Sequence, residues 1–254
     1  MDNQSLFDWL VSNPVASPYR DPVNIEALAA DFGSRGYVKL PGFFTSAAFA
    51  FIQGEVARIQ AASTRREFTM PGYNTPRRLS VIGGDRIVDE SLPLALLYGN
   101  SELRAALGRI ARGQVCFVRH QAEFMVANYL ESVHDTHGWH LDDPQFALVV
   151  ILESPRRDEG GNVEFIRNWR EFCADQRLDA DTDIEAGVAL AGAHGRIEVE
   201  HHVAGDCYLL DAGACLHRVT PIASDARRSV LNLAYDGGLE REYGRTADIL
   251  YGVA

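Results

Sequence analysis

The chain has 254 residues, of which 46% are hydrophobic and 23% charged, as is typical of a soluble globular protein with a substantial core. Its formal net charge of −11 argues against a nucleic-acid partner or an anionic membrane surface, because both require clustered Lys and Arg. The four cysteines form no CxxC pair and are widely spaced, which indicates reduced thiols rather than a disulfide framework or a zinc site.

The N-terminal sequence lacks a basic region followed by an apolar run, so it does not resemble a signal peptide. The longest apolar stretch, Ala147 to Leu152, has the length of a strand and is too short to cross a bilayer. We therefore expect a soluble, cytoplasmic protein. Base rates for soluble proteins favour a homodimer as its oligomeric state.

The first part of the chain is predicted to be largely helical. Asp21-Pro22 begins a helical pattern that ends at the glycines of GSRGY, and YVKLPGFF follows as a short strand. Thr45 is a plausible N-cap for a helix that continues to about Ala62. The polar segment 64–78 is predicted to be a loop, and two further helices are predicted near 91–98 and 102–111.

From Gln114 onward the sequence is typical of short strands separated by turns. These segments are rich in Val, Leu, Tyr and Phe, and no regular helices intervene, which favours a sandwich or jelly-roll barrel over a parallel α/β sheet. The predicted strands are 114–118, 123–130, 146–153, 196–203, 206–212 and 228–236. We expect one domain over 1–254: helical support in 1–113, and a β core in 114–254 with an acidic insertion near 168–187.

The segment HDTHGWHLDD, residues 134–143, contains a His-x-Asp pair formed by His140 and Asp142. In an extended chain residues i and i+2 point to the same face, so an imidazole and a carboxylate can converge on one cation. The best candidate for a third ligand is His217, at the end of another predicted strand. Two imidazoles and a carboxylate leave three positions of an octahedral ion open, as non-haem Fe(II) oxygenases require, although zinc also accepts such ligands.

Arg228, eleven positions after His217, favours iron over zinc. A guanidinium there can hold the distal carboxylate of 2-oxoglutarate while the keto acid end chelates the metal. Taken singly, each of these residues has an ordinary explanation, such as a loop histidine or a surface ion pair. The combination of HxD before a strand, a distant His and a later Arg points to an iron oxygenase.

These residues resemble the Fe(II)/2-oxoglutarate-dependent dioxygenase superfamily, whose pattern is HxD…H…R on a double-stranded β-helix, a cupin-like jelly roll. A narrower resemblance, carried by HGWHLDD, by AEF at 122–124 and by RSVLNLAYD, is to the free amino-acid (lysine) hydroxylases related to the radical amino-acid halogenases. In the halogenating relatives Gly or Ala replaces the metal-binding Asp. Because Asp142 is present, the resemblance implies hydroxylation.

The resemblance also implies a substrate pocket. One group of side chains would bind the α-carboxylate and another the ammonium groups of an amino acid by charge-assisted hydrogen bonds. The residues that match are Arg77 and His137 for the carboxylate, Glu123 and Asp143 for ammonium, and Asn232. Each also has a structural alternative: Arg77 as a solvated loop residue, Glu123 on the outer face of its strand, Asp143 in an Asx turn and His137 as a loop histidine.

Two positions complete the comparison with the relatives. At position 234, where we expect a hydroxyl residue in the halogenating relatives, this chain has Ala234. The resemblance therefore does not determine which residue contacts the amine of the substrate. Relatives close the site with aromatic residues near the C-terminus, where this chain has Tyr251.

His194, His201 and His202 lie in or beside a strand that looks solvent-facing and are interpreted as structural or surface groups.

The predicted function is Fe(II)- and 2-oxoglutarate-dependent hydroxylation, with O₂, of an unactivated side-chain carbon of a free amino acid, with release of succinate and CO₂. Lysine is the first choice, and arginine, ornithine or a neutral amino acid stay open. Alternatives are the same chemistry on a carrier-bound or peptidyl substrate, desaturation or epimerisation, a zinc hydrolase, and a non-catalytic cupin-like metal- or ligand-binding protein.

Overall fold

Antiparallel strands dominate the computed structural model, which describes residues 13–238 and 242–252. Within these residues twelve strands form one sheet in the order β1-β10-β7-β12-β5-β3-β6-β11-β8-β9, with β2 paired to β3 and β4 to β12. The strands are β1 (Tyr37–Pro41), β2 (Thr64–Met70), β3 (Thr75–Ile82), β4 (Cys116–Phe117), β5 (Met125–Leu130), β6 (Thr136–His140), β7 (Phe146–Glu153), β8 (Val163–Ile166), β9 (Glu198–Glu200), β10 (Asp206–Asp211), β11 (Leu216–Val219) and β12 (Arg228–Asp236).

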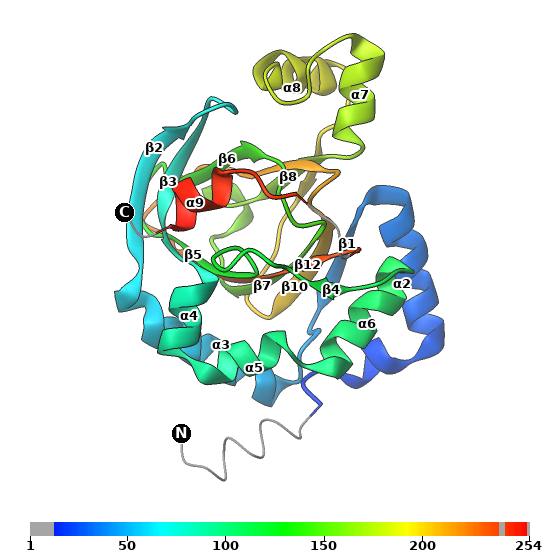
Figure 1. Ribbon diagram of the computed structural model, residues 1–254, viewed down its shortest axis with the longest axis vertical. Coiled ribbons are helices and arrows are strands. Elements are labelled where there is room, and N and C mark those ends of the chain that lie inside the picture. The colour runs from blue at the N-terminus through cyan, green and yellow to red at the C-terminus, as the bar shows by residue number, and fades with distance from the viewer. Residues whose placement is uncertain (1–12, 239–241, 253–254) are drawn as a thin grey trace.

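Helices flank the sheet, mostly along one side (Figure 1). They are α2 (Pro22–Arg35), α3 (Ser46–Ile59), α4 (Gly84–Glu90), α5 (Leu92–Tyr98), α6 (Ser101–Ala111), α7 (Trp169–Gln176), α8 (Ile184–Ala193) and α9 (Thr246–Tyr251), with short 3₁₀ turns at Ser17–Arg20, Gln60–Ala62 and Arg157–Glu159. The predicted class, a mainly β jelly roll with flanking helices, is confirmed.

The N-terminal helices begin and end where their capping residues dictate. The Asp21 side chain accepts a hydrogen bond of 2.8 Å from the Val23 amide, and Pro22 occupies the first turn of α2. Gly36 then ends α2 in the left-handed region, at φ 67°. Thr45 accepts from the Ala48 amide at 3.2 Å and caps α3, as the sequence predicts.

The central strand β7 is buried on both faces, which explains its nearly continuous apolar sequence. Leu148, Val150 and Leu152 belong to the large core beneath the helices. Ala147, Val149 and Ile151 belong to a second cluster inside the rolled sheet. The neighbouring strand β12 alternates in the same way, with Leu231 and Leu233 on the helix side. The alternate residues of β12 therefore face the interior of the roll.

The prediction of a loop over 64–78 is wrong, because this segment forms the hairpin β2–β3. Every second residue of β3 from Thr75 to Leu79 is buried, but the middle one of these is Arg77. A charged residue at an inward position hid the period-2 pattern. The turn uses Gly72 at φ 87° and Asn74 at φ 53°, two residue types that tolerate positive φ.

Three further features differ from the sequence prediction. The short elements α4, β6, β8 and β11 were not among the predicted helices and strands. Glu123 lies in a turn two residues before β5 rather than within a strand. His202 is buried rather than solvent-facing, with 3% of its surface exposed, and its ring nitrogen lies 2.7 Å from the Tyr37 hydroxyl. Its interpretation as a structural residue fits this contact.

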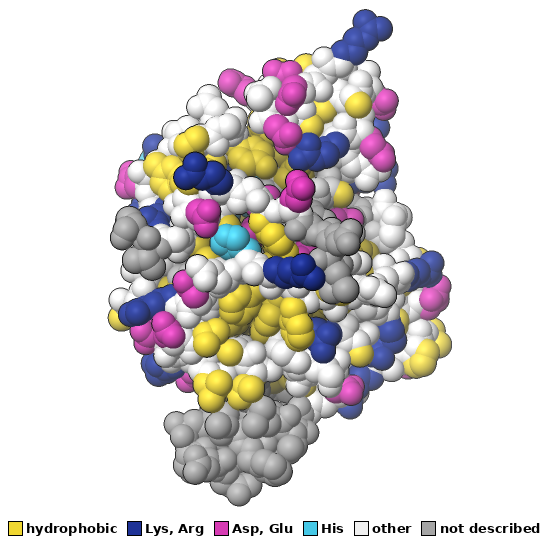
Figure 2. Space-filling model, in the orientation of Figure 1, with side chains coloured by type: hydrophobic (Ala, Val, Ile, Leu, Met, Phe, Trp, Pro, Cys, Tyr) yellow, Lys and Arg dark blue, Asp and Glu magenta, His cyan; other side chains and the backbone are white. Residues whose placement is uncertain are grey.

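The insertion predicted near 168–187 contains α7 and the beginning of α8, which protrude at the top of Figure 1. In the face shown in Figure 2, acidic and basic side chains are interspersed. No helix in the described part of the chain has the length and apolar character needed to span a membrane. The N-terminal residues 1–12, for which no signal peptide is predicted, lie outside the described residues.

Gly138, in β6, allows the β2–β3 hairpin to approach closely. A Cβ atom at this position would lie 2.8 Å from both the Cδ and the carbonyl oxygen of Pro76. We expect Gly138→Ala to lower the free energy of unfolding by about 1–3 kcal/mol, because the contact is with backbone that cannot rotate away. Urea denaturation measures the effect.

The matched control is Gly54→Ala in α3, where a Cβ would meet no atom within 4 Å. This variant should gain about 0.5–1 kcal/mol, since alanine restricts the unfolded chain and favours a helix. A Gly138→Ala protein as stable as the native one would contradict the close packing of β6 against the hairpin.

Candidate active site

Three predicted metal ligands converge at one end of the roll. His140 ends β6, His217 lies in β11, and the two residues are direct partners in the antiparallel ladder. Asp142 follows β6 and is positioned by its amide, which donates to the Ala212 carbonyl at 3.1 Å. One ligand atom from each of the three side chains lies within 4.8 Å of the others.

The histidine tautomers suit metal binding. Nδ1 of His140 lies 2.7 Å from the Gly138 carbonyl, and Nδ1 of His217 lies 2.9 Å from the Cys215 carbonyl. Because a carbonyl only accepts, each Nδ1 carries the proton and each Nε2 presents a lone pair. The two Nε2 atoms lie 3.3 Å and 3.7 Å from one oxygen of Asp142.

These facing electron-pair donors fit a cation. Burial, followed by the neighbouring His217, lowers the pKa of His140 to about 4, so its imidazole is neutral at physiological pH. Two imidazoles and a carboxylate around one space form the 2-His-1-carboxylate set of non-haem Fe(II) enzymes. The two carbonyl contacts orient the rings from behind, as is usual for metal-binding histidines.

Arg228, the first residue of β12, lies in the same cavity and is 3% exposed. Its side chain is hydrogen-bonded to Tyr208 of β10, while its Nη2 atom has no partner among the described residues. Burial lowers the pKa of this guanidinium, yet it remains a cation. A buried cation with an unused donor calls for an anionic ligand such as a carboxylate.

Arg77 is a second buried cation, with no anionic partner in the described part of the chain. It is fully buried in β3, opposite His137 in the β3–β6 ladder. Its Nη1 donates to Thr75 Oγ1 at 2.9 Å, but Nε and Nη2 have no partner among the described residues. Burial lowers its pKa to about 10. The His137 ring stacks on His140 with centroids 4.0 Å apart, and its Nε2 also lacks a partner.

Glu123 supplies a buried carboxyl group with one unsatisfied oxygen. It is 8% exposed, and its Oε2 atom has no hydrogen-bond partner among the described residues. Burial first, and then the charges of Asp142 and Asp143, raise its pKa to about 9. Asp143 is half-buried and accepts a hydrogen bond of 2.8 Å from the Gly244 amide, which contradicts a purely local turn role.

The remaining predicted residues also reach this region. Asn232 of β12 lines the cavity and its Oδ1 atom has no partner among the described residues. Tyr251 of α9 lines the cavity as well, and α9 is held in place by Arg66, which donates to the Leu250 carbonyl at 2.8 Å. Ala234 is buried in β12.

Sequence reasoning missed two polar residues that line the cavity, Asn128 and Tyr208. Asn128 lies in β5, all six residues of which are buried. A side-chain amide inside an otherwise apolar strand needs a polar partner, so its sequence context was an available signal. Tyr208 gave no such signal, since tyrosine is common in buried strands.

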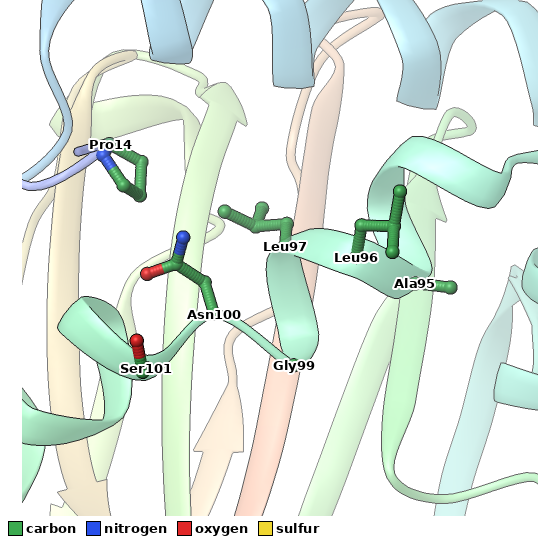
Figure 3. A pocket seen from close by; sticks show the side chains of 7 residues that line it. All are labelled: Pro14, Ala95, Leu96, Leu97, Gly99, Asn100 and Ser101. Atoms are coloured by element: carbon green, nitrogen blue, oxygen red, sulfur yellow. The ribbon is translucent and has the colours of Figure 1, made fainter. Parts of the chain in front are cut away.

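Another hollow, shown in Figure 3, lies between α5, α6 and the beginning of the described chain. The residues that line it are Pro14, Ala95, Leu96, Leu97, Gly99, Asn100 and Ser101, and none of these is titratable. It therefore offers no ligand set comparable with that of the metal cavity.

Comparison with solved structures supports the fold. The epimerase SnoN, described as non-heme and alpha ketoglutarate dependent, from nogalamycin biosynthesis, is 18% identical, with a TM-score of 0.65 over 85% of this chain and 84% of that one. The carbocyclase SnoK from nogalamycin biosynthesis gives 13% identity and a TM-score of 0.64, with 83% of each chain covered. EctD from S. alaskensis, solved with 2-oxoglutarate and 5-hydroxyectoine, gives 20% identity and a TM-score of 0.60 over 92% of this chain and 81% of that one. No curated protein sequence matches the chain.

The two-histidine, one-carboxylate cluster, together with a match to a family model over residues 20–250, defines the class as Fe(II)/2-oxoglutarate-dependent oxygenases, with iron and 2-oxoglutarate as cofactors. Within that superfamily the chain belongs to the Halogenase D (HalD) family, whose sequence pattern it matches over residues 20–250.

The metal cluster can be tested by thermal unfolding under anaerobic conditions. We expect Fe(II) to stabilise the native protein by about 2.7 kcal/mol when its free concentration is 100 times its Kd. In His217→Ala the stabilisation should be lost, because two ligands hold the ion poorly. In the control His194→Ala, which alters an exposed histidine, it should persist. Equal stabilisation of His217→Ala and native protein would exclude His217 as a ligand.

The raised pKa of Glu123 predicts a pH-dependent stability in metal-free protein. The ordinary pKa of this carboxyl group is 4.5, and its pKa in the folded protein is about 9. Between these two pH values the native state keeps a proton that the unfolded chain has released. The contribution of Glu123 to the free energy of unfolding is therefore fully present below pH 4.5 and is lost as the pH rises to about 9. The Glu123→Gln variant cannot ionise at this position. Its melting temperature should therefore rise relative to that of the native protein as the pH increases from 5 to 8.

The control for this experiment is Glu185→Gln, at an exposed position of α8. Its difference from the native protein should not change over the same pH range. A pH-independent difference for Glu123→Gln would show that the Glu123 carboxyl is already ionised in the folded protein.

Proposed function

We propose that this oxygenase hydroxylates an unactivated side-chain carbon of a free cationic amino acid, with L-lysine as the substrate, and releases succinate and CO₂. The observation that carries the proposal is a buried cation and a buried carboxyl group near the metal cluster, each with unsatisfied hydrogen-bonding atoms. Arg77 is a buried cation and Glu123 a buried acid, each with atoms that lack a partner among the described residues. A ligand bearing both a carboxylate and an ammonium group would satisfy both.

In this proposal His140, Asp142 and His217 hold iron, and Arg228 anchors the distal carboxylate of 2-oxoglutarate. The bound iron and 2-oxoglutarate supply the O₂-dependent oxidation when a substrate carbon lies next to them. Tyr208 keeps the Arg228 guanidinium in place through their hydrogen bond. The chain's own contribution is to hold one C–H bond close to the metal and the others away from it.

The substrate groups would be divided between the two sides of the cavity. Arg77 and His137 face each other across the β3–β6 ladder and can donate to the α-carboxylate. Glu123 and Asp143 can accept from ammonium groups, and the Asn232 amide adds a neutral partner. The Tyr251 ring, which lines the cavity from α9, would cover the aliphatic part of the substrate.

The presence of Asp142 favours hydroxylation over halogenation. With three protein ligands and a chelating 2-oxoglutarate, an octahedral iron has one position left, which O₂ requires. A halide ion would have no coordination site. The family name alone therefore does not determine the reaction of this chain, and the carboxylate at position 142 is the residue that distinguishes the two outcomes.

The first experiment is anaerobic reconstitution with Fe(II) and 2-oxoglutarate, followed by O₂ exposure with lysine, arginine, ornithine and norleucine. Mass spectrometry would detect succinate and a product with one added oxygen atom. We expect lysine-dependent succinate matched by hydroxylysine. Norleucine, which has the carbon chain of lysine without its terminal ammonium, should be a poor substrate because Glu123 and Asp143 would lose their partner.

Glu123→Gln should lower kcat/KM for lysine about 100-fold, since a buried charge-assisted contact is lost, and should affect norleucine much less. Succinate formation that does not depend on any amino acid would agree with the oxygenase class but would refute the proposal that the substrate is a free amino acid. Equal turnover of lysine and norleucine would refute the proposed recognition of the terminal ammonium group.

A further inference from the structure

The cavity beside the metal cluster is too small for the ligands that the proposed function requires. Its volume is about 40 Å³, which is room for a few water molecules. Sites that bind small molecules typically measure about 300–1,000 Å³. Part of the cavity wall must therefore move when an amino acid and 2-oxoglutarate bind.

Tyr251 is the part of the wall that is held least firmly. Among the described residues that line the cavity it is the one carried by a helix, whereas the others lie on strands or, in the case of Asp142, just after one. Each of those strands is paired with a neighbour on both sides, so its position is fixed by two ladders of backbone hydrogen bonds. The helix α9 has 6 residues, too few for an isolated helix to be stable. Its position therefore depends on the contacts that it makes with the sheet.

Those contacts join α9 to the β2–β3 hairpin. Leu250 is 2% exposed and packs with Met70 and Leu79. Arg66 is opposite Leu79 in the β2–β3 ladder, so both side chains point to the same face of the hairpin. The Nε atom of Arg66 donates to the Leu250 carbonyl at 2.8 Å, and its Nη2 atom donates to the Gly252 carbonyl. The last carbonyls of a helix have no donor within the helix, and here an arginine supplies it.

The two carbonyls that Arg66 binds belong to the residues immediately before and after Tyr251. The guanidinium therefore fixes the backbone at the position whose side chain lines the cavity. Another polar contact of α9, between His120 and Asp248 at 3.2 Å, involves a carboxylate that is 64% exposed, and such a pair contributes little. Of the side chains described, Arg66 is thus the one best placed to set the position of Tyr251.

We propose that Arg66 is a positioning residue for the substrate: without touching it, Arg66 holds α9 closed, with the Tyr251 ring against the carbon chain of the amino acid. The helix α9 is then the part of the wall that moves when a substrate enters, and the two hydrogen bonds of Arg66 form again as it closes. The inference rests on the proposed function, because it takes an amino acid as the molecule that Tyr251 covers. Arg66 and Arg77 lie on the same hairpin, so the element proposed to bind the α-carboxylate also anchors the helix that closes the site.

The first test is hydrogen–deuterium exchange of the segment 246–252 in the Fe(II)-loaded protein under anaerobic conditions. Arg66→Ala should make the amides of α9 exchange about 10-fold faster, since two charge-assisted hydrogen bonds that keep the helix closed are lost. Arg66→Lys can supply one of the two contacts and should give an intermediate rate. The control is Arg78→Ala, at an exposed position of the same hairpin, which should exchange like the native protein. Unchanged exchange in Arg66→Ala would overturn the proposal.

The second test is the Kd for amino acids, measured by calorimetry under anaerobic conditions with Fe(II) and 2-oxoglutarate bound. Arg66→Ala should raise the Kd values for lysine and norleucine about 10-fold each, because Tyr251 would cover the carbon chain that the two share. Glu123→Gln should instead weaken lysine much more than norleucine. The Kd for 2-oxoglutarate should stay within about twofold of the native value. A loss confined to lysine, or an equal loss for 2-oxoglutarate, would overturn the proposal.

A double-mutant cycle decides whether Arg66 acts through Tyr251. Tyr251→Ala should raise the Kd for lysine by a similar factor, and the variant with both substitutions should bind lysine no more weakly than Tyr251→Ala alone. Effects that multiply would show that Arg66 acts by another route and would overturn the proposal. If no amino acid binds to the native protein, the proposed substrate is refuted, and the exchange rates of α9 in Arg66→Ala still decide whether Arg66 holds the helix.

Discussion

The pairing of β6 with β11 is the constraint on which the active site depends. It sets His140 opposite His217, and a slip of one residue would turn one imidazole away from the other. The ladder becomes irregular just beyond this pair, between His217 and Val219. Asp142 is then fixed by its own amide, which donates to the carbonyl of Ala212, the first residue after β10. Backbone hydrogen bonds therefore determine the geometry of the metal ligands.

The site also holds buried ionisable groups that would be unfavourable in a protein without a ligand. Arg77, Glu123 and Arg228 are each buried with at least one atom that lacks a partner among the described residues. Such groups cost several kcal/mol and are retained at functional sites, where a ligand supplies the missing contact. The apolar packing of β7 and β12 on both faces provides a rigid, stable frame that can tolerate this cost.

The sequence predicted the parts of the fold in which local pattern and tertiary role agree. The caps Asp21 and Thr45 begin helices as expected, and the apolar strand 146–153 forms at the centre of the sheet. It failed for the β2–β3 hairpin, since Arg77 interrupts the apolar alternation at a buried position that the proposed substrate site uses. The same conflict between local pattern and site chemistry explains why the position of Glu123 relative to β5 was misjudged.

The sequence by itself determined the reaction class, because HxD, a distant His and a later Arg specify a metal and a co-substrate through residue types and spacing alone. It also placed a carboxylate at position 142, the residue on which the proposal of hydroxylation rests. Only the tertiary structure decided which polar residues share the cavity with the metal. Asn128 and Tyr208 come from β5 and β10, and their convergence depends on strand order and register, which arise from long-range pairing that no local pattern encodes.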